Sequence, residues 1–94
     1  VPFNIASYSF LTHLIAHHCG LKARKFVHVI GNAHIYKDHY DALAKQVMRG
    51  AVEMFPFPKL KIKNKYDSID DYKFEDFEIE NYKHLEPIKM DMVA

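Results

Sequence analysis

The chain has 94 residues, enough for one small domain, and its 49% hydrophobic and 14% aromatic content is typical of a folded protein. Its formal net charge of +1, from 13 basic and 12 acidic residues, indicates no bulk attraction to DNA or to a membrane surface. One cysteine excludes an internal disulfide and fits a reducing, cytoplasmic compartment. No apolar run reaches the roughly 18–20 residues that span a bilayer, so neither a DNA nor a membrane partner is predicted.

The first part of the chain is predicted to form a buried helix. Residues 1–4 are expected to be a short extended lead, because Pro2 disfavours helical geometry at Val1. Residues 5–19 then carry apolar or small side chains on nearly every side of a helix, which is typical of a buried one. Gly20 is placed to end it in a left-handed turn. A buried helix is unusual in so short a chain, so we expect upstream sequence or another subunit to cover it.

Residues 26–36, Phe-Val-His-Val-Ile-Gly-Asn-Ala-His-Ile-Tyr, are predicted to form the strand around which the rest is organised. Side chains of a strand alternate between two faces, and here one face is uniformly small or branched and apolar. The other face becomes polar toward its end, where Asn32, His34 and Tyr36 offer donors and acceptors in a row. The pattern fits the floor of a binding pocket, or simply a half-buried strand with a solvated face.

The rest of the chain is predicted to alternate short elements. Asp38 is expected to cap a helix that ends at Gly50, with Tyr40, Leu43 and Val47 forming one apolar stripe. Further expected elements are a strand at Leu60 and Ile62, a turn or short helix over residues 67–71, a strand at Phe77 and Ile79, and an alternating tail over residues 88–93.

Two groups of side chains were weighed as sites of metal or covalent chemistry. His13 and His17 lie four residues apart with His18 adjacent, a spacing that suits a transition metal. No carboxylate or thiolate accompanies them at ligand spacing, so histidines at the edge of a core are favoured and no metal is predicted. Cys19 is interpreted as an inert thiol at the end of a buried helix rather than a nucleophile. The sequence has no Gly-rich phosphate loop.

Asn4 has two interpretations. As a polar amide at the start of a helix it suits the helix cap, which is the commoner use. Alternatively it pairs with an amide-like edge of a ligand, because a carboxamide offers both a donor and an acceptor.

Five stretches in order closely resemble the thymidylate synthase family. They are Val-Pro-Phe-Asn-Ile-Ala-Ser-Tyr-Ser over residues 1–9, Gly-Asn-Ala-His-Ile-Tyr over 31–36, Phe-Pro-Lys-Leu over 57–60, Ile-Asp-Asp-Tyr over 69–72 and Ile-Lys-Met-Asp-Met over 88–92. The resemblance covers essentially the whole chain, but only the C-terminal part of the family's synthase domain. Residues 1–94 are therefore interpreted as the C-terminal portion of a single α+β domain, in which a large mixed sheet surrounds a buried central helix.

The resemblance implies reductive methylation of deoxyuridine monophosphate (dUMP) to thymidine monophosphate (dTMP) by a cytoplasmic homodimer, with 5,10-methylenetetrahydrofolate as cosubstrate. In the family a cysteine thiolate adds to the pyrimidine ring, which divides one difficult step into easier ones. The family's Pro-Cys-His motif lies upstream of where this chain begins, and so do the arginines that hold the nucleotide phosphate, some of which the partner subunit donates. No catalytic residue is therefore assigned here, and the 94-residue segment alone is predicted to be inactive. Whether a dihydrofolate reductase is fused to it, as in protozoan relatives, stays open.

The resemblance also implies roles for three substrate-binding residues. Asn4 would pair with the uracil edge, accepting from the ring N–H and donating to a carbonyl, whereas a carboxylate would suit cytosine better. His34 and Tyr36 would bond the sugar hydroxyl, which agrees with the polar row on the expected strand.

Phe3, Met92 and Val93 would cover the folate, with the tail closing as a small lid that excludes water. Two departures from the family pattern affect the surroundings of this site. Residues 50–55 form a longer connection than usual, and the ending Val93-Ala94 replaces the more usual Ala-Val type.

Two alternatives belong to other functional classes. One is a nucleotide- or folate-binding module that keeps the pocket floor without the nucleophile. The other is an interaction fragment whose apolar surfaces dock a partner. An upstream Pro-Cys-His on the same polypeptide would favour the synthase, and binding of dUMP to the fragment would separate the two alternatives.

Overall fold

The computed structural model describes residues 1–52 and 54–92. They divide into two compact units, one formed by residues 1–29 with 58–82 and the other by residues 30–57 with the segment that starts at Lys83. None of the described helices is long and apolar enough to cross a membrane.

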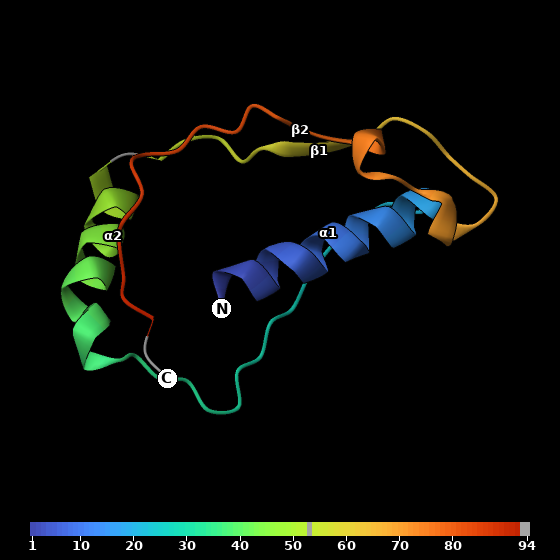
Figure 1. Ribbon diagram of the computed structural model, residues 1–94. Helices are drawn as coiled ribbons and strands as arrows, with labels where there is room; N and C mark the ends of the chain where they lie inside the picture. The colour runs from blue at the N-terminus through green and yellow to red at the C-terminus, as the bar shows by residue number, and fades with distance from the viewer. Residues whose placement is uncertain (53, 93–94) are drawn as a thin grey trace. The chain divides into compact units, whose positions relative to one another are not determined.

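Helix α1 (Pro2–His18) opens the first unit (Figure 1). The extended lead expected over residues 1–4 is wrong, because Val1 is the N-cap and Pro2 lies in the first helical turn. Proline is well tolerated there, since the first N–H groups of a helix have no intrahelical partner. Cys19 is the C-cap and Gly20 follows with φ of +67°, which confirms the predicted left-handed end.

Helix α1 is apolar on nearly every side, as expected, but it is not buried in this structure. Ala16 is its one buried residue, whereas Leu11 and Ile15 are 41% and 44% exposed. The burial prediction is therefore wrong for the described residues, because they cover only part of the helix surface.

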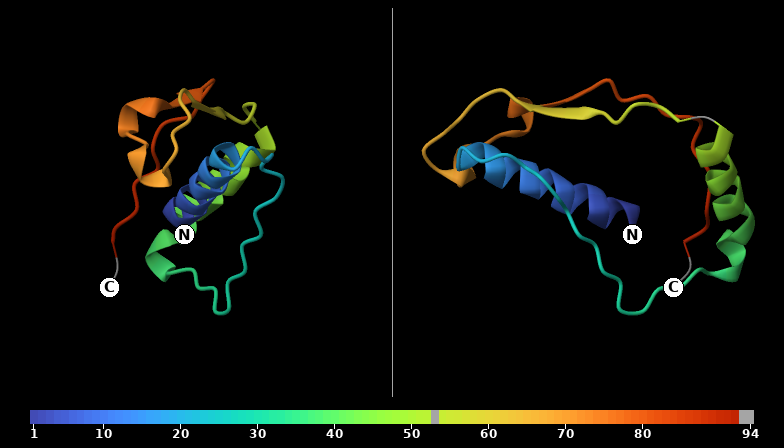
Figure 2. Two further views of the ribbon diagram at one scale, coloured as in Figure 1. Left: turned by 90° about the vertical axis from the view of Figure 1, so that its right-hand side faces the viewer. Right: turned by 180° about the vertical axis from the view of Figure 1, so that it is seen from behind.

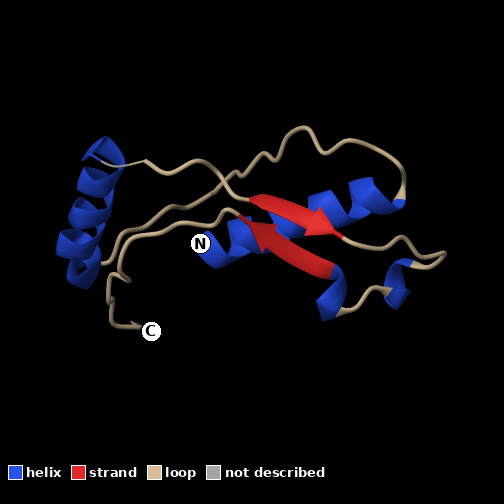
Figure 3. Cartoon of the chain, turned by 90° about the horizontal axis from the view of Figure 1, so that it is seen from above, coloured by secondary structure: helices blue, strands red, loops and turns tan. Residues whose placement is uncertain are grey.

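Strands β1 (Lys59–Ile62) and β2 (Phe77–Glu80) form a two-stranded antiparallel sheet, which confirms both predicted strands. In the register, Leu60 lies opposite Ile79 and Ile62 opposite Phe77, so the apolar side chains share one face. This sheet lies along α1 in all three further views (Figures 2 and 3). The Phe77 ring packs against Phe10 of α1 at a centroid distance of 4.7 Å.

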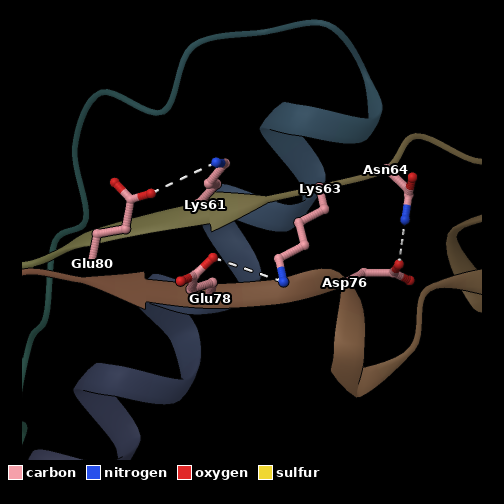
Figure 4. Close-up of polar contacts among 6 residues, drawn as sticks. All are labelled: Lys61, Lys63, Asn64, Asp76, Glu78 and Glu80. Atoms are coloured by element: carbon pink, nitrogen blue, oxygen red, sulfur yellow. Dashed lines mark hydrogen bonds and ion pairs between the residues drawn. The ribbon is translucent and has the colours of Figure 1, made fainter.

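The other face of the sheet carries opposite charges on its two strands, lysines on β1 and glutamates on β2. Lys61 Nζ lies 3.9 Å from the Glu80 carboxylate, and Lys63 Nζ lies 3.8 Å from that of Glu78 (Figure 4). These pairs are largely exposed, so each contributes about 0–1 kcal/mol to stability. They fit the observed register, because a slip of one residue would place lysines of β1 opposite Ile79 and Phe77 on the apolar face.

A connection with two short 3₁₀ helices, η2 (Ile69–Asp71) and η3 (Phe74–Asp76), joins the strands, and η2 confirms the turn or short helix expected there. The connection is held by the carboxylate of Asp76, which is 5% exposed. Its Oδ1 accepts from Asn64 Nδ2 at 2.7 Å (Figure 4) and from the Tyr66 hydroxyl at 2.9 Å. Its Oδ2 accepts from the Lys73 backbone N–H at 2.8 Å. These bonds give the buried carboxylate partners for both oxygens.

The strand predicted over residues 26–36 is wrong. Residues 21–36 contain neither helix nor strand, and Val29, on the expected apolar face, is 83% exposed. Alternation makes a segment suited to a sheet, but a strand forms only when a neighbour supplies backbone hydrogen bonds. No strand of the described residues lies beside this segment, and the backbone hydrogen bond at its end, from the His39 N–H to the Tyr36 carbonyl, belongs to the turn of η1.

The second unit contains the 3₁₀ helix η1 (Lys37–His39) and helix α2 (Tyr40–Val52). The helix expected here is confirmed, but both predicted ends are wrong. Asp38 lies inside η1, where Tyr36 is the N-cap, and α2 continues past Gly50. Gly50 is thus tolerated within the last turn, although glycine weakens a helix interior.

The predicted apolar stripe of α2 is mostly uncovered. Leu43 is half-buried, whereas Tyr40 and Val47 are 56% and 73% exposed. The segment from Lys83 to Met92 has neither helix nor strand, so the alternation expected over residues 88–93 makes no strand in its described part. Val93 lies outside the described residues.

Candidate functional site

Asn4 lies inside the first turn of α1 rather than at its cap. Val1 takes the cap position, so the capping interpretation of Asn4 is wrong. The Asn4 side chain is exposed and, within residues 1–52 and 54–92, makes no hydrogen bond. Its carboxamide therefore retains a donor and an acceptor for a ligand edge.

Phe3 precedes Asn4 in the same helical turn and is 86% exposed. Successive helical residues project about 100° apart. The start of α1 thus presents an aromatic ring and a carboxamide from adjacent positions on one element.

His34 and Tyr36 lie two residues apart just before η1, in a segment that is neither helix nor strand. Tyr36 has extended backbone geometry, with φ of −69° and ψ of 144°. The side chains of both residues are exposed, Tyr36 by 50%. The two residues thus belong to one segment, although the expected sheet that would carry them is absent from the described residues.

His39 is a site residue that the sequence analysis missed. Its ring contacts that of Tyr36 edge-on, with centroids 5.6 Å apart and planes at 74°. Its Nε2–H donates to the backbone carbonyl of Asp91 at 2.6 Å. The spacing of three residues from Tyr36, one 3₁₀ turn, was the available signal.

Arg49 of α2 makes a second bond to the C-terminal segment. Its Nη1 donates to the backbone carbonyl of Glu86 at 2.6 Å. Beyond these bonds, Met92 is fully exposed, and Val93 lies outside the described residues. The predicted folate-covering residue Met92 therefore follows a segment that two side chains of the second unit hold through its backbone.

The candidate residues fall into both units. Phe3 and Asn4 belong to the first, and His34, Tyr36 and Met92 belong to the second.

The histidines of α1 have structural partners. His17 Nε2–H donates to the Asn64 backbone carbonyl at 2.9 Å, and His18 Nδ1 is hydrogen-bonded to the Tyr72 hydroxyl at 3.2 Å. Among the described residues, no three histidine, cysteine or carboxylate side chains lie close enough to hold a metal ion. The bonds of His17 and His18 fix the end of α1 to the connection between the strands.

Cys19 lies at the end of α1 as expected, but it is exposed, so the predicted burial of its thiol is wrong. Ala16 just before it is buried and His17 and His18 are half-buried, so this end of α1 is covered only in part.

Two groups of the connection between the strands, Asp76 and Tyr66, have shifted pKa values. The Lys73 backbone N–H and the Asn64 amide stabilise the carboxylate and lower the pKa of Asp76 below its ordinary value. Its hydrogen bond from Tyr66 raises the pKa of that hydroxyl, because ionisation would remove the donated proton. Since protein groups satisfy both carboxylate oxygens, this cluster serves the fold.

The whole chain, residues 1–94, matches the family model for thymidylate synthase. The chain belongs to the thymidylate synthase family. It is 53% identical over 94 residues to human thymidylate synthase, covering all of this chain and 29% of the human protein. It is 51% identical over 92 residues to thymidylate synthase of Saccharomyces cerevisiae, covering 98% of this chain and 29% of the yeast protein.

A relative of the bifunctional type also matches. The chain is 47% identical over 94 residues to the bifunctional dihydrofolate reductase-thymidylate synthase of Plasmodium berghei, covering all of this chain and 16% of that protein. The chain thus spans less than a third of the length of these relatives. Family membership confirms the resemblance, while the described residues show helices and a small antiparallel sheet in place of the expected large mixed sheet.

Proposed function

We propose that this chain acts within a longer thymidylate synthase that methylates dUMP reductively to dTMP. The support is family membership across the whole chain and about half identity to the human and yeast synthases. Identity to monofunctional and bifunctional relatives is similar, so the proposal concerns the synthase reaction alone. The proposed enzyme is a cytoplasmic homodimer whose nucleophilic cysteine comes from outside these residues.

The observation that carries the proposal is the exposed carboxamide of Asn4, whose donor and acceptor have no partner in the described chain. Uracil presents a ring N–H beside a carbonyl, and one carboxamide can complete both bonds. Cytosine presents the reversed pattern, a bare ring nitrogen beside an amino group, which matches the carboxamide only when it is turned by 180°. Asn4 is therefore proposed to select the uracil nucleotide.

His34 and Tyr36 are proposed to bond the sugar hydroxyl of the nucleotide. A tyrosine hydroxyl both donates and accepts, and a neutral imidazole has one donor and one acceptor nitrogen. Two such groups suffice to hold a hydroxyl in one orientation. Their common segment supports a shared role.

Phe3, Met92 and Val93 are proposed to cover the cosubstrate 5,10-methylenetetrahydrofolate. The Phe3 ring and the Met92 side chain are almost wholly exposed, so each has apolar surface to bury against a ligand. Closure of the C-terminal segment over the folate would exclude water from the reaction.

The test is Asn4→Asp in the complete synthase polypeptide that carries these residues. We expect turnover of dUMP to fall by roughly 100-fold or more, because the carboxylate cannot donate to the uracil carbonyl. Discrimination between dUMP and its cytosine counterpart should shift toward cytosine. Steady-state kinetics with both nucleotides measures the change.

The matched control is Asn81→Asp. Asn81 is exposed and has φ of 60°, a conformation that aspartate also tolerates. It should leave both rates unchanged. Equal nucleotide discrimination in the Asn4 variant and the wild type would refute the assignment of Asn4, and turnover by residues 1–94 alone would refute the external nucleophile.

A further inference from the structure

His39 stands between the candidate sugar-binding tyrosine and the C-terminal segment, and it contacts each by a different part of its ring. Its ring meets the Tyr36 ring edge-on at 5.6 Å, and its backbone N–H donates to the Tyr36 carbonyl at 3.0 Å. Its Nε2–H donates to the Asp91 carbonyl at 2.6 Å. Tyr36, His39 and Asp91 belong to the same unit.

These contacts make the orientation of one imidazole depend on two neighbours. The hydrogen bond from the His39 N–H to the Tyr36 carbonyl fixes the position of the His39 backbone. The Tyr36 ring then restricts rotation of the imidazole. A hydrogen bond weakens steeply as its donor angle falls, so rotation of the imidazole would weaken the bond to Asp91. His39 is half-buried, which further restricts its alternative positions.

We infer that His39 is a positioning residue that couples the nucleotide contact at Tyr36 to closure of the C-terminal segment. The inference rests on the proposed function, because it takes Tyr36 as a nucleotide contact and the C-terminal segment as the lid. A nucleotide that fixes the Tyr36 ring also fixes the imidazole, and the aligned Nε2–H then holds the Asp91 carbonyl. Met92, the next residue, is thereby placed for the folate.

Arg49 provides a comparison within the same unit. It also donates from a side chain to a carbonyl of the C-terminal segment at 2.6 Å, but at Glu86, five residues before Asp91. Among the described residues, Arg49 makes no hydrogen bond, ion pair or ring contact with Tyr36. Arg49 therefore anchors the base of the segment independently of Tyr36, whereas His39 anchors its far end through a residue that touches Tyr36.

The experiment measures amide hydrogen exchange over residues 87–92 of the complete synthase, with and without dUMP, in wild type and in His39→Phe. Phenylalanine keeps an aromatic ring beside Tyr36 and removes the N–H donor. In wild type, dUMP should slow exchange of these amides. In His39→Phe, exchange should be faster without ligand and should no longer respond to dUMP, although calorimetry shows dUMP still bound.

Steady-state kinetics should also distinguish the role of His39 from that of Arg49. His39→Phe should raise the KM for methylenetetrahydrofolate by roughly 3- to 10-fold, the equivalent of one lost hydrogen bond, with a smaller change in kcat. His39→Gln retains a side-chain N–H donor and should recover part of the loss. Arg49→Gln should speed exchange without ligand but keep the response to dUMP.

Each outcome has a defined meaning. If bound dUMP does not slow amide exchange over residues 87–92 of the wild type, the coupling is overturned. It is also overturned if dUMP slows exchange in His39→Phe as much as in the wild type. A response lost equally in Arg49→Gln shows general loosening of the segment and also overturns the special role of His39. A wild-type enzyme that binds dUMP and slows exchange but does not form dTMP overturns the proposed synthase activity and leaves the coupling standing.

Discussion

The hairpin over residues 59–80 and the segment over residues 21–36 have similar alternating sequences but different structures. The hairpin forms both of its predicted strands, whereas the segment forms none. In the hairpin, the strands are joined by the connection over residues 63–76, which Asp76 ties by hydrogen bonds to Asn64, Tyr66 and Lys73. In the segment, no partner strand occurs among the described residues. Alternation thus shows that a segment suits a sheet, and a nearby partner decides whether it forms one.

The largest expected effect is a contrast in hydrogen exchange between these two regions of the 94-residue polypeptide. Amides that join β1 to β2 should exchange at least ~10-fold more slowly than those of residues 26–30, because only the former are hydrogen-bonded across a ladder. Exchange measured by mass spectrometry after peptide digestion would show it. Equal protection in the two regions would mean that residues 26–36 pair with a neighbour after all.

In the complete synthase, the difference in amide exchange rate between the hairpin and residues 26–36 should be smaller. If residues 26–36 gain strand partners there, their amides should become protected by ~10-fold or more relative to the 94-residue polypeptide. The same measurement on both polypeptides separates a segment that lacks partners from one that cannot form a strand at all. Unchanged rapid exchange in the complete protein would support the second explanation.

A smaller effect is expected from removing the packing between the hairpin and α1. Phe77→Ala should lower the free energy of unfolding by roughly 1–3 kcal/mol, less than for a fully buried phenylalanine, because the Phe77 ring packs on Phe10 but stays partly exposed. Denaturant unfolding followed by circular dichroism measures the change. Phe74→Ala is the matched control, since Phe74 is 89% exposed and should shift stability by no more than about 0.5 kcal/mol. Equal losses in the two variants would show that the hairpin does not depend on α1.

The elements that could be predicted from the sequence are those whose stabilising contacts are local. Helix α1, its end at Gly20, both hairpin strands and the turn at η2 follow from periodicity and turn residues a few positions apart. The sequence does not predict the start of α1 correctly, because Pro2 disfavours helical geometry at Val1 but is itself favourable in the first helical turn. Burial of α1 and the strand over residues 26–36 depend on surfaces from elsewhere, and no local pattern provides those.

The candidate site also contains residues that a sequence pattern indicates and residues that only the folded chain brings together. The resemblance indicated Asn4, His34 and Tyr36 as candidate residues because they lie within the matching stretches over residues 1–9 and 31–36. The contacts of His39 and Arg49 with the C-terminal segment join residues 52 and 37 positions apart. No short-range sequence pattern contains such pairs, so only the folded chain shows them.

The smallest effect concerns pH and the connection between the two strands of the hairpin. The pKa of Asp76 is lowered below its ordinary value of 3.8, chiefly by the Lys73 N–H and the Asn64 amide. A lowered folded-state pKa contributes stability that is present above about pH 4 and is lost as pH falls through the folded value. Asp76→Asn should therefore lower the melting temperature by several degrees at pH 7, and its difference from wild type should shrink progressively below pH 4.

The control for this prediction is Asp71→Asn, because Asp71 is an exposed aspartate on the same connection whose side chain makes none of these bonds. Its melting temperature should follow that of wild type from pH 7 to pH 3. A constant difference between Asp76→Asn and wild type over that range would show that the hairpin depends on the shape of the Asp76 side chain rather than on its charge. Packing such as that of Phe77 would then be what stabilises the hairpin without distant partners. The Asp76 carboxylate would contribute only the shape of its side chain and not its charge.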